Sequence, residues 1–251
     1  MKKGNGDTVK RSRIVLVGFC AALCSVVIAV LAGLGSRLGW WHFSTGFIIL
    51  RWAVYTASLS LVLSVLGAYL ARPGRRRRGG LWAFFAIVIS LSVILVPYSW
   101  LQTARSVPPI HDISTDTRDP PRFVAIVPLR KNAPNPVEYG GPEIATQQSE
   151  AYPDIEPLIL SLSSRQAFDR ALDVAKKMGW HVVAADADNG RIEATDTTFW
   201  FGFRDDIVIR IAPDHHATRI DVRSLSRVGR SDVGTNARRI RNFMKLMNNT
   251  D

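Results

Sequence analysis

Residues 206–223 have the sequence DIVIRIAPDHHATRIDVR, in which two runs of alternating apolar and charged residues flank a short polar segment. Successive side chains of a β-strand point to opposite faces, so each run predicts a strand with one apolar and one charged face. The apolar positions are Ile207, Ile209 and Ile211 in the first run and Ile220 and Val222 in the second. We therefore expect antiparallel strands over 206–211 and 218–223, joined by a turn over 212–217.

A helix and a hairpin are expected before this pair. Residues 163–178 repeat apolar side chains at intervals of three and four, with Ser163 or Ser164 as the N-cap and a glycine at the end. Strands are expected over 180–185 and 191–195, because the Asn-Gly pair between them is typical of a tight hairpin turn.

A second helix is expected after the central pair, with Ser231 as its cap. Its buried stripe would be Val233, Ala237, Ile240, Met244 and Met247. Residues 163–248 then form the regular core of an α+β domain, an antiparallel sheet with helices packed on one face.

Residues 105–160 precede this core and hold ten of the 13 prolines. Proline lacks an amide donor, so no long helix or central strand is expected here, although a short strand over 123–127 would fit. Apolar residues favour an arm that wraps the core over a plain linker: Phe123, Ile126, Leu129, Tyr139, Ile144, Tyr152 and Leu158. We expect 105–251 to be one domain that includes this arm.

The first 104 residues contain three uncharged apolar runs, over about 14–34, 52–70 and 81–100. About 20 apolar residues in a helix cross a hydrocarbon core of about 30 Å. Five of the seven tryptophans lie at or beside the ends of these runs, as in an interfacial aromatic belt. Residues 1–104 are therefore predicted to be a module of three transmembrane helices that contacts the lipid bilayer.

The net charge of +11 is concentrated in this module, which holds 12 Lys and Arg against one acidic residue. Most of these basic residues precede the first run or lie in the segment 71–80, and positively charged segments stay cytoplasmic. The N-terminus is therefore expected in the cytoplasm of a bacterium. Three crossings of the inner (plasma) membrane then place the C-terminal domain in the periplasm.

The C-terminal part holds 20 basic and 20 acidic residues, so no net field attracts nucleic acid. The two cysteines of the chain both lie in the first apolar run, which excludes a disulfide-rich scaffold. A domain that binds lipid or a polymer at the membrane surface is a further alternative, against which the zero net charge argues.

Asp206 and Asp221 are the candidate catalytic residues, for a hydrolase facing the periplasm. Adjacent strand residues point to opposite faces, so Asp205 and Asp206 would not act on one substrate together. The alternative is that these carboxylates pair with arginines inside the fold.

A second candidate is an anion-binding site formed by Arg223, Arg227, Arg230 and Ser231, next to the start of the last helix. Guanidinium groups beside free helical amides can hold a phosphate or a carboxylate. The alternative is that these arginines neutralise aspartates within the domain.

The histidines have no spacing typical of a zinc site, and no phosphate-binding loop or nucleophile elbow occurs, so no metal and no cofactor is expected. Nothing specifies catalysis, and a non-enzymatic role is favoured.

The C-terminal part resembles domain-of-unknown-function family 1499, and the likeness spans about 105–248. It rests on IHDISTD at 110–116, PPRF at 120–123, YPD at 152–154, GW at 179–180, IEA at 192–194, FRDD at 203–206, DVRSLSRVGRSD at 221–232, Asn236, Arg239 and Ile240. A preceding three-helix membrane module resembles one bacterial branch of that family. The resemblance implies no activity, substrate or catalytic residue.

The sequence thus predicts an inner-membrane protein whose periplasmic domain binds an envelope protein or a small anionic ligand. The hydrolase or anion-binding enzyme remains the alternative.

Overall fold

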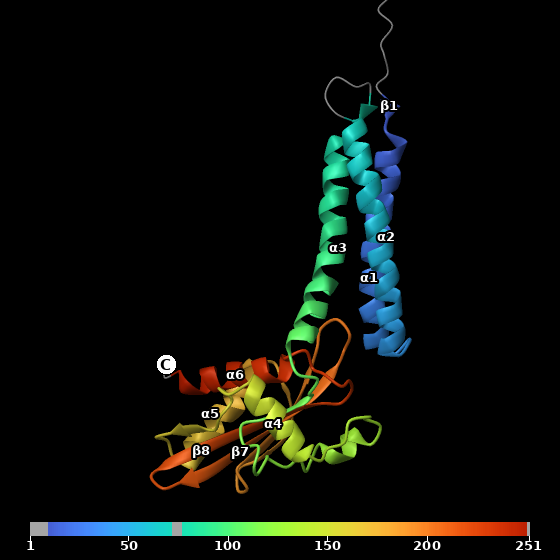
Figure 1. Ribbon diagram of the computed structural model, residues 1–251. Coiled ribbons are helices and arrows are strands. Elements are labelled where there is room, and N and C mark those ends of the chain that lie inside the picture. Colours follow the sequence, from blue (N-terminus) through green and yellow to red (C-terminus); the bar gives the residue numbers. More distant parts are fainter. Residues whose placement is uncertain (1–9, 72–76, 250–251) are drawn as a thin grey trace, which may run out of the picture. The chain divides into compact units, whose positions relative to one another are not determined.

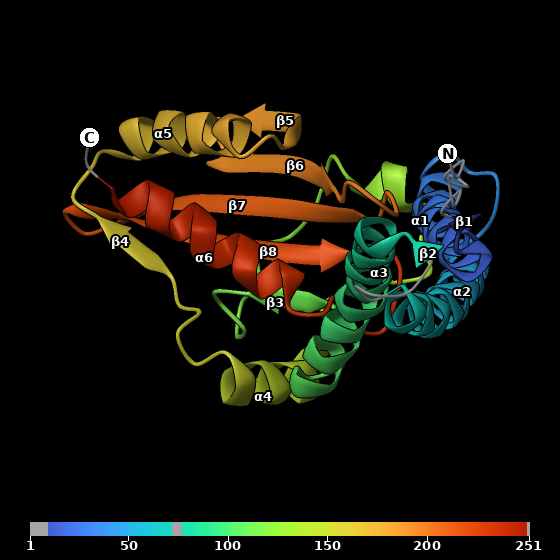
Figure 2. The same ribbon diagram turned by 90° about the horizontal axis from the view of Figure 1, so that it is seen from above.

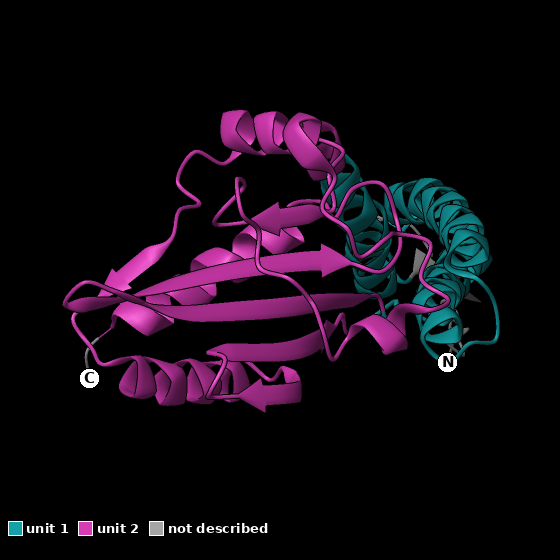
Figure 3. Cartoon of the chain, turned by 90° about the horizontal axis from the view of Figure 1, so that it is seen from below, with its two compact units in different colours: residues 1–101, 200–202 teal, residues 102–199, 203–251 magenta. Residues whose placement is uncertain are grey.

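The computed structural model describes residues 10–71 and 77–249. The chain divides into two compact units (Figure 3). The helical unit comprises Met1–Leu101 together with Trp200–Gly202, and the sheet unit comprises Gln102–Phe199 and Phe203–Asp251.

Three long helices make up most of the helical unit (Figure 1): α1 (Arg13–Arg37), α2 (Phe43–Leu70) and α3 (Gly80–Ser106). Each is long and apolar enough to cross a membrane, as the three apolar runs predicted. The second helix begins nine residues before the expected span, because residues 43–51 continue its apolar pattern. Arg51, which precedes the expected span, therefore lies inside α2. Two short strands, β1 (Lys10–Arg11) and β2 (Arg77–Arg78), pair in parallel.

Small residues let α1 and α2 approach closely. A Cβ on Gly18 would lie 2.6 Å from the Ser64 hydroxyl, so the packing there requires a glycine. Ser60 donates a hydrogen bond to the Gly18 carbonyl over 2.7 Å, and Ser90 of α3 donates to the Ser60 hydroxyl over 2.9 Å. This chain of hydroxyls links all three helices.

The sheet unit contains a six-stranded antiparallel sheet. Its order is β3-β8-β7-β6-β5, and β4 also pairs with β8. The strands are β3 (Asp112–Ser114), β4 (Leu158–Leu160), β5 (His181–Asp186), β6 (Arg191–Thr197), β7 (Arg204–Asp214) and β8 (Ala217–Ser226). The two strands predicted from the opening stretch are the central pair β7–β8. Both are longer than predicted and turn at His215 and His216.

The helices α5 (Ser164–Lys177) and α6 (Thr235–Asn248) cover one face of this sheet, as Figure 2 shows. Ser163 caps α5 in a capping box with Gln166. The core between helices and sheet includes the predicted strand residues Ile207, Ile209, Ile211, Ile220 and Val222. The mixed α+β architecture is therefore confirmed.

The start of α6 differs from the expectation. The N-cap is Gly234, and the Asp232 carboxylate accepts hydrogen bonds from the amides of Gly234 and Asn236. Ser231 accepts from the amide of Val233, which precedes the helix, so its predicted capping role is wrong. Val233 lies outside the helix, and α6 buries Phe243, which the predicted stripe missed.

The proline-rich residues 105–160 hold more regular structure than expected. They contain β3, a 3₁₀ helix η1 (Val127–Arg130), α4 (Gly141–Ala151) and β4. Pro142 lies in the first turn of α4, where a missing amide donor costs no hydrogen bond. The short strand considered for 123–127 is absent, since the amides of residues 124–126 bind a side chain instead, as described below.

The sheet face away from α5 and α6 carries a second, smaller core. Phe123 and Ile126 from the proline-rich segment pack there on Val208 and Leu225. Of the predicted wrapping residues, Tyr152 is also buried, whereas Leu129 is 54% exposed. We call the sheet face on which residues 119–139 pack, away from α5 and α6, the outer face.

Candidate functional site

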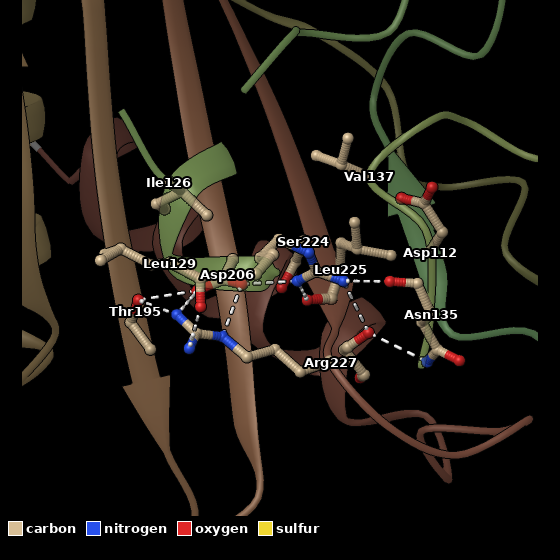
Figure 4. A network of polar contacts seen from close by, with 12 residues as sticks. Asp112, Ile126, Leu129, Asn135, Val137, Thr195, Asp206, Ser224, Leu225 and Arg227 are labelled. Carbon is tan, nitrogen blue, oxygen red and sulfur yellow. Dashed lines mark hydrogen bonds and ion pairs between the residues drawn. The ribbon is translucent and has the colours of Figure 1, made fainter. Parts of the chain in front are cut away.

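Asp206 is fully buried on the outer face, where three side chains donate to it (Figure 4). Arg130 of η1 donates to Oδ2 over 2.5 Å. Arg227 binds both carboxylate oxygens, with Nε 2.9 Å from Oδ2 and Nη2 2.8 Å from Oδ1. The Thr195 hydroxyl donates to Oδ1 over 2.7 Å. Both oxygens of this carboxylate therefore have donors from the chain itself.

Burial acts on the Arg130 partner as well. Its side chain is 3% exposed, and this loss of hydration lowers the pKa of the guanidinium although Asp206 opposes the shift. Arg130 also donates to the carbonyls of Asn135 and Ser226, which fixes η1 against the end of β8. These contacts are those of a structural ion pair.

Asp221 is also fully buried and lies between two arginines. Arg210, directly opposite on β7, donates to Oδ2 over 3.0 Å and 3.2 Å. Arg219 donates to both oxygens over 3.0 to 3.2 Å. The same arginines bind Asp116, over 3.2 Å and 2.7 Å respectively, and these carboxylates raise the pKa of Arg219. Asp221 is thus one member of an alternating chain of charges.

Asp205 and Asp206 point to opposite faces, as the alternation of a strand requires. Asp205 faces α6, where Arg239 donates to it over 2.6 Å. Arg239 also pairs with Asp196 over 2.8 Å and donates to Ser224 and Asn236. The two adjacent carboxylates therefore belong to separate networks.

The candidate anion-binding residues are not brought together. Arg223 is buried and binds Asp112, while Arg227 binds Asp206. Arg230 is exposed and makes no ion pair within residues 10–71 and 77–249. Ser231 uses its oxygen within its own turn. Of these four candidates, Arg230 alone has no carboxylate partner among the described residues, which is too little for a multidentate anion site.

Glu193 of β6 is a buried carboxylate that is not among the candidate residues predicted from the sequence. It is fully buried and accepts from the consecutive amides of Val124, Ala125 and Ile126 over 2.9 to 3.1 Å. Arg191 pairs with it over 3.1 Å. A carboxylate that accepts from consecutive amides fixes the segment that carries those amides. In the sequence, the only indication of this role is that Glu193 lies on the charged face of β6.

The outer face also has a hollow of about 480 Å³ beside the β5–β6 turn, lined in part by Arg122, Arg191 and Arg210. Arg210 already pairs with three carboxylates and Arg191 with two. The wall is therefore neutralised by the chain, apart from Arg122. Within the described residues, no three His, Cys, Asp or Glu side chains gather as a metal site.

Two family models match the chain. The model described as "Protein of unknown function (DUF1499)" matches residues 112–247. The model described as "Negative regulator of sigma F" (NrsF) matches residues 4–128. No curated protein matches the chain.

Proposed function

Since the chain belongs to DUF1499, a protein family of unknown function, we propose its role from its own geometry. It is a protein of the bacterial inner membrane whose C-terminal domain, residues 105–251, faces the periplasm. That domain is a binding module for an envelope partner or ligand and performs no catalysis.

The ion pairing of the candidate residues carries this proposal. Asp206, Asp221, Arg223 and Arg227 all bind oppositely charged groups of the same domain. A general base or nucleophile must be able to reach a substrate, and an anion site must offer unused donors. These four ion-paired side chains therefore stabilise the fold. A partner or ligand would be bound by the side chains around them.

The membrane topology rests on the three membrane-length helices and the distribution of charge. Lys2, Lys3, Lys10, Arg11 and Arg13 precede α1, and five arginines lie between α2 and α3, at 72 and 75–78. These two segments favour the cytoplasm, which puts the end of α3 in the periplasm.

Paired reporter fusions test this topology. Alkaline phosphatase fused after Asp251 should be active and a green fluorescent protein at the same place dark, with the opposite pattern for fusions in the segment 72–76. A stable chain with a fluorescent C-terminal fusion would contradict the proposal.

A ligand screen then tests the binding role. Melting of the full chain in detergent would be followed with metal ions, nucleotides, sugars and envelope lipids, since a ligand of the native state raises the melting temperature. The enzymatic alternative requires that Asp206→Asn abolishes a hydrolytic activity while the chain stays folded. We expect this variant to lose stability instead.

The match to the regulator model favours a second candidate function. It covers the three membrane helices, and its description, negative regulator of sigma F, refers to control of a transcription factor. The basic segments between and before these helices would then contact a sigma factor on the cytoplasmic side. The C-terminal domain would report envelope conditions to that contact.

Transcription from a sigma F-dependent promoter tests this candidate. The full chain should lower reporter expression, and replacement of arginines 75–78 with glutamine should relieve the repression. A matched control replaces Arg165, Arg170 and Arg238 of the helices α5 and α6, which should leave repression unchanged. Equal expression with and without the full chain would exclude this role.

A further inference from the structure

The tip of the loop between β6 and β7 is Phe199-Trp200-Phe201-Gly202, three aromatic residues and a glycine, none of which carries a charge. Its base is closed by two hydrogen bonds. The Thr198 amide donates to the Phe203 carbonyl over 2.8 Å, and the Phe203 amide donates to the Thr198 hydroxyl over 2.9 Å. These two hydrogen bonds fix the base of the loop, so its aromatic tip has a defined conformation.

The tip residues Trp200–Gly202 belong to the helical unit. The Trp200 indole lies on Gly33 of α1, where any Cβ would overlap it, and its Nε1 donates to the Val30 carbonyl over 3.4 Å. The Phe201 ring lies 4.9 Å from the ring of Phe47 of α2, and Phe201 is 5% exposed. A Cβ on Gly46 of α2 would lie 2.9 Å from the Phe201 ring, so Gly33 and Gly46 together form a seat for the tip.

This seat lies at one end of two membrane-length helices. Val30 and Gly33 lie in the last two turns of α1, and Phe47 lies in the second turn of α2. The same end carries Trp40 and Trp41 in the connection between the helices. Tryptophan is enriched where the headgroups meet the acyl chains, so we expect the seat at interfacial depth.

Phe199 has the largest exposed fraction, 91%, among the large apolar residues that the structure describes. An exposed phenylalanine beside an interfacial tryptophan is placed to contact lipid. We propose that the loop 199–202 is an interfacial membrane anchor, with Trp200 and Phe201 in the glycine seat and Phe199 in the boundary between headgroups and acyl chains. The partner of this surface is the bilayer.

The anchor goes beyond the proposed function, because it requires neither a periplasmic location nor a ligand or sigma factor. It requires only that α1 and α2 are embedded in a membrane. A chain with the opposite topology would carry the same anchor in the other leaflet.

Quenching of a probe at position 199 tests the anchor. The full chain carries Phe199→Cys in a Cys20→Ala, Cys24→Ala background, is labelled with an environment-sensitive fluorophore, and is reconstituted in phosphatidylcholine–phosphatidylglycerol vesicles. The control probe replaces Asp188, an exposed residue in the turn at the opposite end of β6.

Doxyl-labelled phosphatidylcholine should quench the probe at 199. Iodide in the buffer should quench the probe at 199 at least about twofold less than it quenches the probe at 188. Equal iodide quenching at both positions, with no quenching by lipid, would overturn the proposal. So would a probe at 199 shielded from both quenchers, because it would be covered by protein.

The seat has its own variant. Gly33→Leu should displace Trp200 and make the probe at 199 more accessible to iodide. Gly80→Leu is the matched control, since a Cβ there meets no atom within 4 Å. If Gly33→Leu leaves the probe as shielded as Gly80→Leu does, the seat does not hold the tip and the proposal fails.

Discussion

Arg223 and Asp112 form a buried, two-point ion pair that joins β8 to β3. Nε of Arg223 lies 2.9 Å from Oδ1 of Asp112, and Nη2 lies 2.7 Å from Oδ2. The guanidinium is 5.1 Å from the ring centroid of Phe123 and 5.4 Å from that of Tyr139. Burial raises the pKa of the Asp112 carboxyl despite Arg223, and burial, followed by the charge of Asp112, raises the pKa of Tyr139 to about 12. This cluster fixes the proline-rich segment to the sheet.

Removing one partner of this pair should be costly. Asp112→Ala leaves the Arg223 charge buried without a carboxylate, and such losses cost about 3–5 kcal/mol. We expect urea unfolding of the full chain in detergent to shift to lower concentration, and the amides of β8 to lose protection from hydrogen exchange.

The double variant separates the charge from the packing. Asp112→Leu with Arg223→Met removes both charges, so it should destabilise the chain less than Asp112→Ala alone. The same two substitutions, Asp112→Leu and Arg223→Met, are also made singly, and a double variant whose loss equals the sum of these two single losses would contradict a coupled pair.

Local patterns predicted the central elements of the fold. The alternation at Ile207, Ile209 and Ile211 defined the buried face of β7, and the Ser163 cap defined the start of α5. These features depend on residues that are neighbours in the sequence. Strand ends were less accurate, because β7 continues through Pro213, whose place at the end of a strand costs no central hydrogen bond.

The partners of the candidate residues could not be predicted in the same way. Arg130 reaches Asp206 across 76 positions, and Arg223 reaches Asp112 across 111. The sequence shows that basic and acidic residues balance in the C-terminal part, which favours internal pairing. It does not show which arginine meets which aspartate, because that depends on the path of the proline-rich segment over the sheet.

Asp116 should make the stability of the sheet unit depend on pH in acid. Burial raises its pKa, but the amides of Asp119 and Arg118 and the charges of Arg219 and Arg210 outweigh this, so the folded-state pKa is lowered. A lowered carboxyl pKa stabilises the fold above the unfolded value of about 3.9, and this contribution is lost as the pH falls through the folded value.

Denaturation midpoints measured from pH 5 to pH 2 test this effect. Asp116→Asn should flatten the part of the curve below about pH 4 by at most about 1 kcal/mol, because its ion pairs are partly screened by solvent. Asp173→Asn, an exposed site on α5, is the control and should leave the curve unchanged. Parallel curves for Asp116→Asn and the wild type would rule out the contribution.

Gly190 should not tolerate alanine. Its φ of +58° is in the left-handed region, and a Cβ there would overlap the Ile211 carbonyl oxygen. We expect Gly190→Ala to destabilise the chain by about 2 kcal/mol or more, from backbone strain and overlap together. Gly179→Ala has a similar φ of +78° but open space, so it should cost only about 1 kcal/mol. Equal losses in urea unfolding would show that the overlap is relieved.

Glu193 should hold the segment at residues 124–126 against the sheet. Its carboxylate accepts from three consecutive amides, and Glu193→Leu would leave those amides without an acceptor, at about 1–3 kcal/mol for each one that stays buried. The segment should therefore detach from β6 before the sheet unfolds. Limited proteolysis of the full chain should then cut between residues 119 and 139, where we expect the wild type to resist cleavage.

A conservative variant distinguishes a lost acceptor from general unfolding. Glu193→Gln retains one carbonyl oxygen and should give intermediate cleavage, while β7 and β8 keep their protection from hydrogen exchange in both variants. Asp186→Leu is the matched control, because it removes another carboxylate that pairs with Arg191 but accepts no amide of the segment. Cleavage of this control as fast as of Glu193→Leu would assign the effect to Arg191 and not to the amide nest.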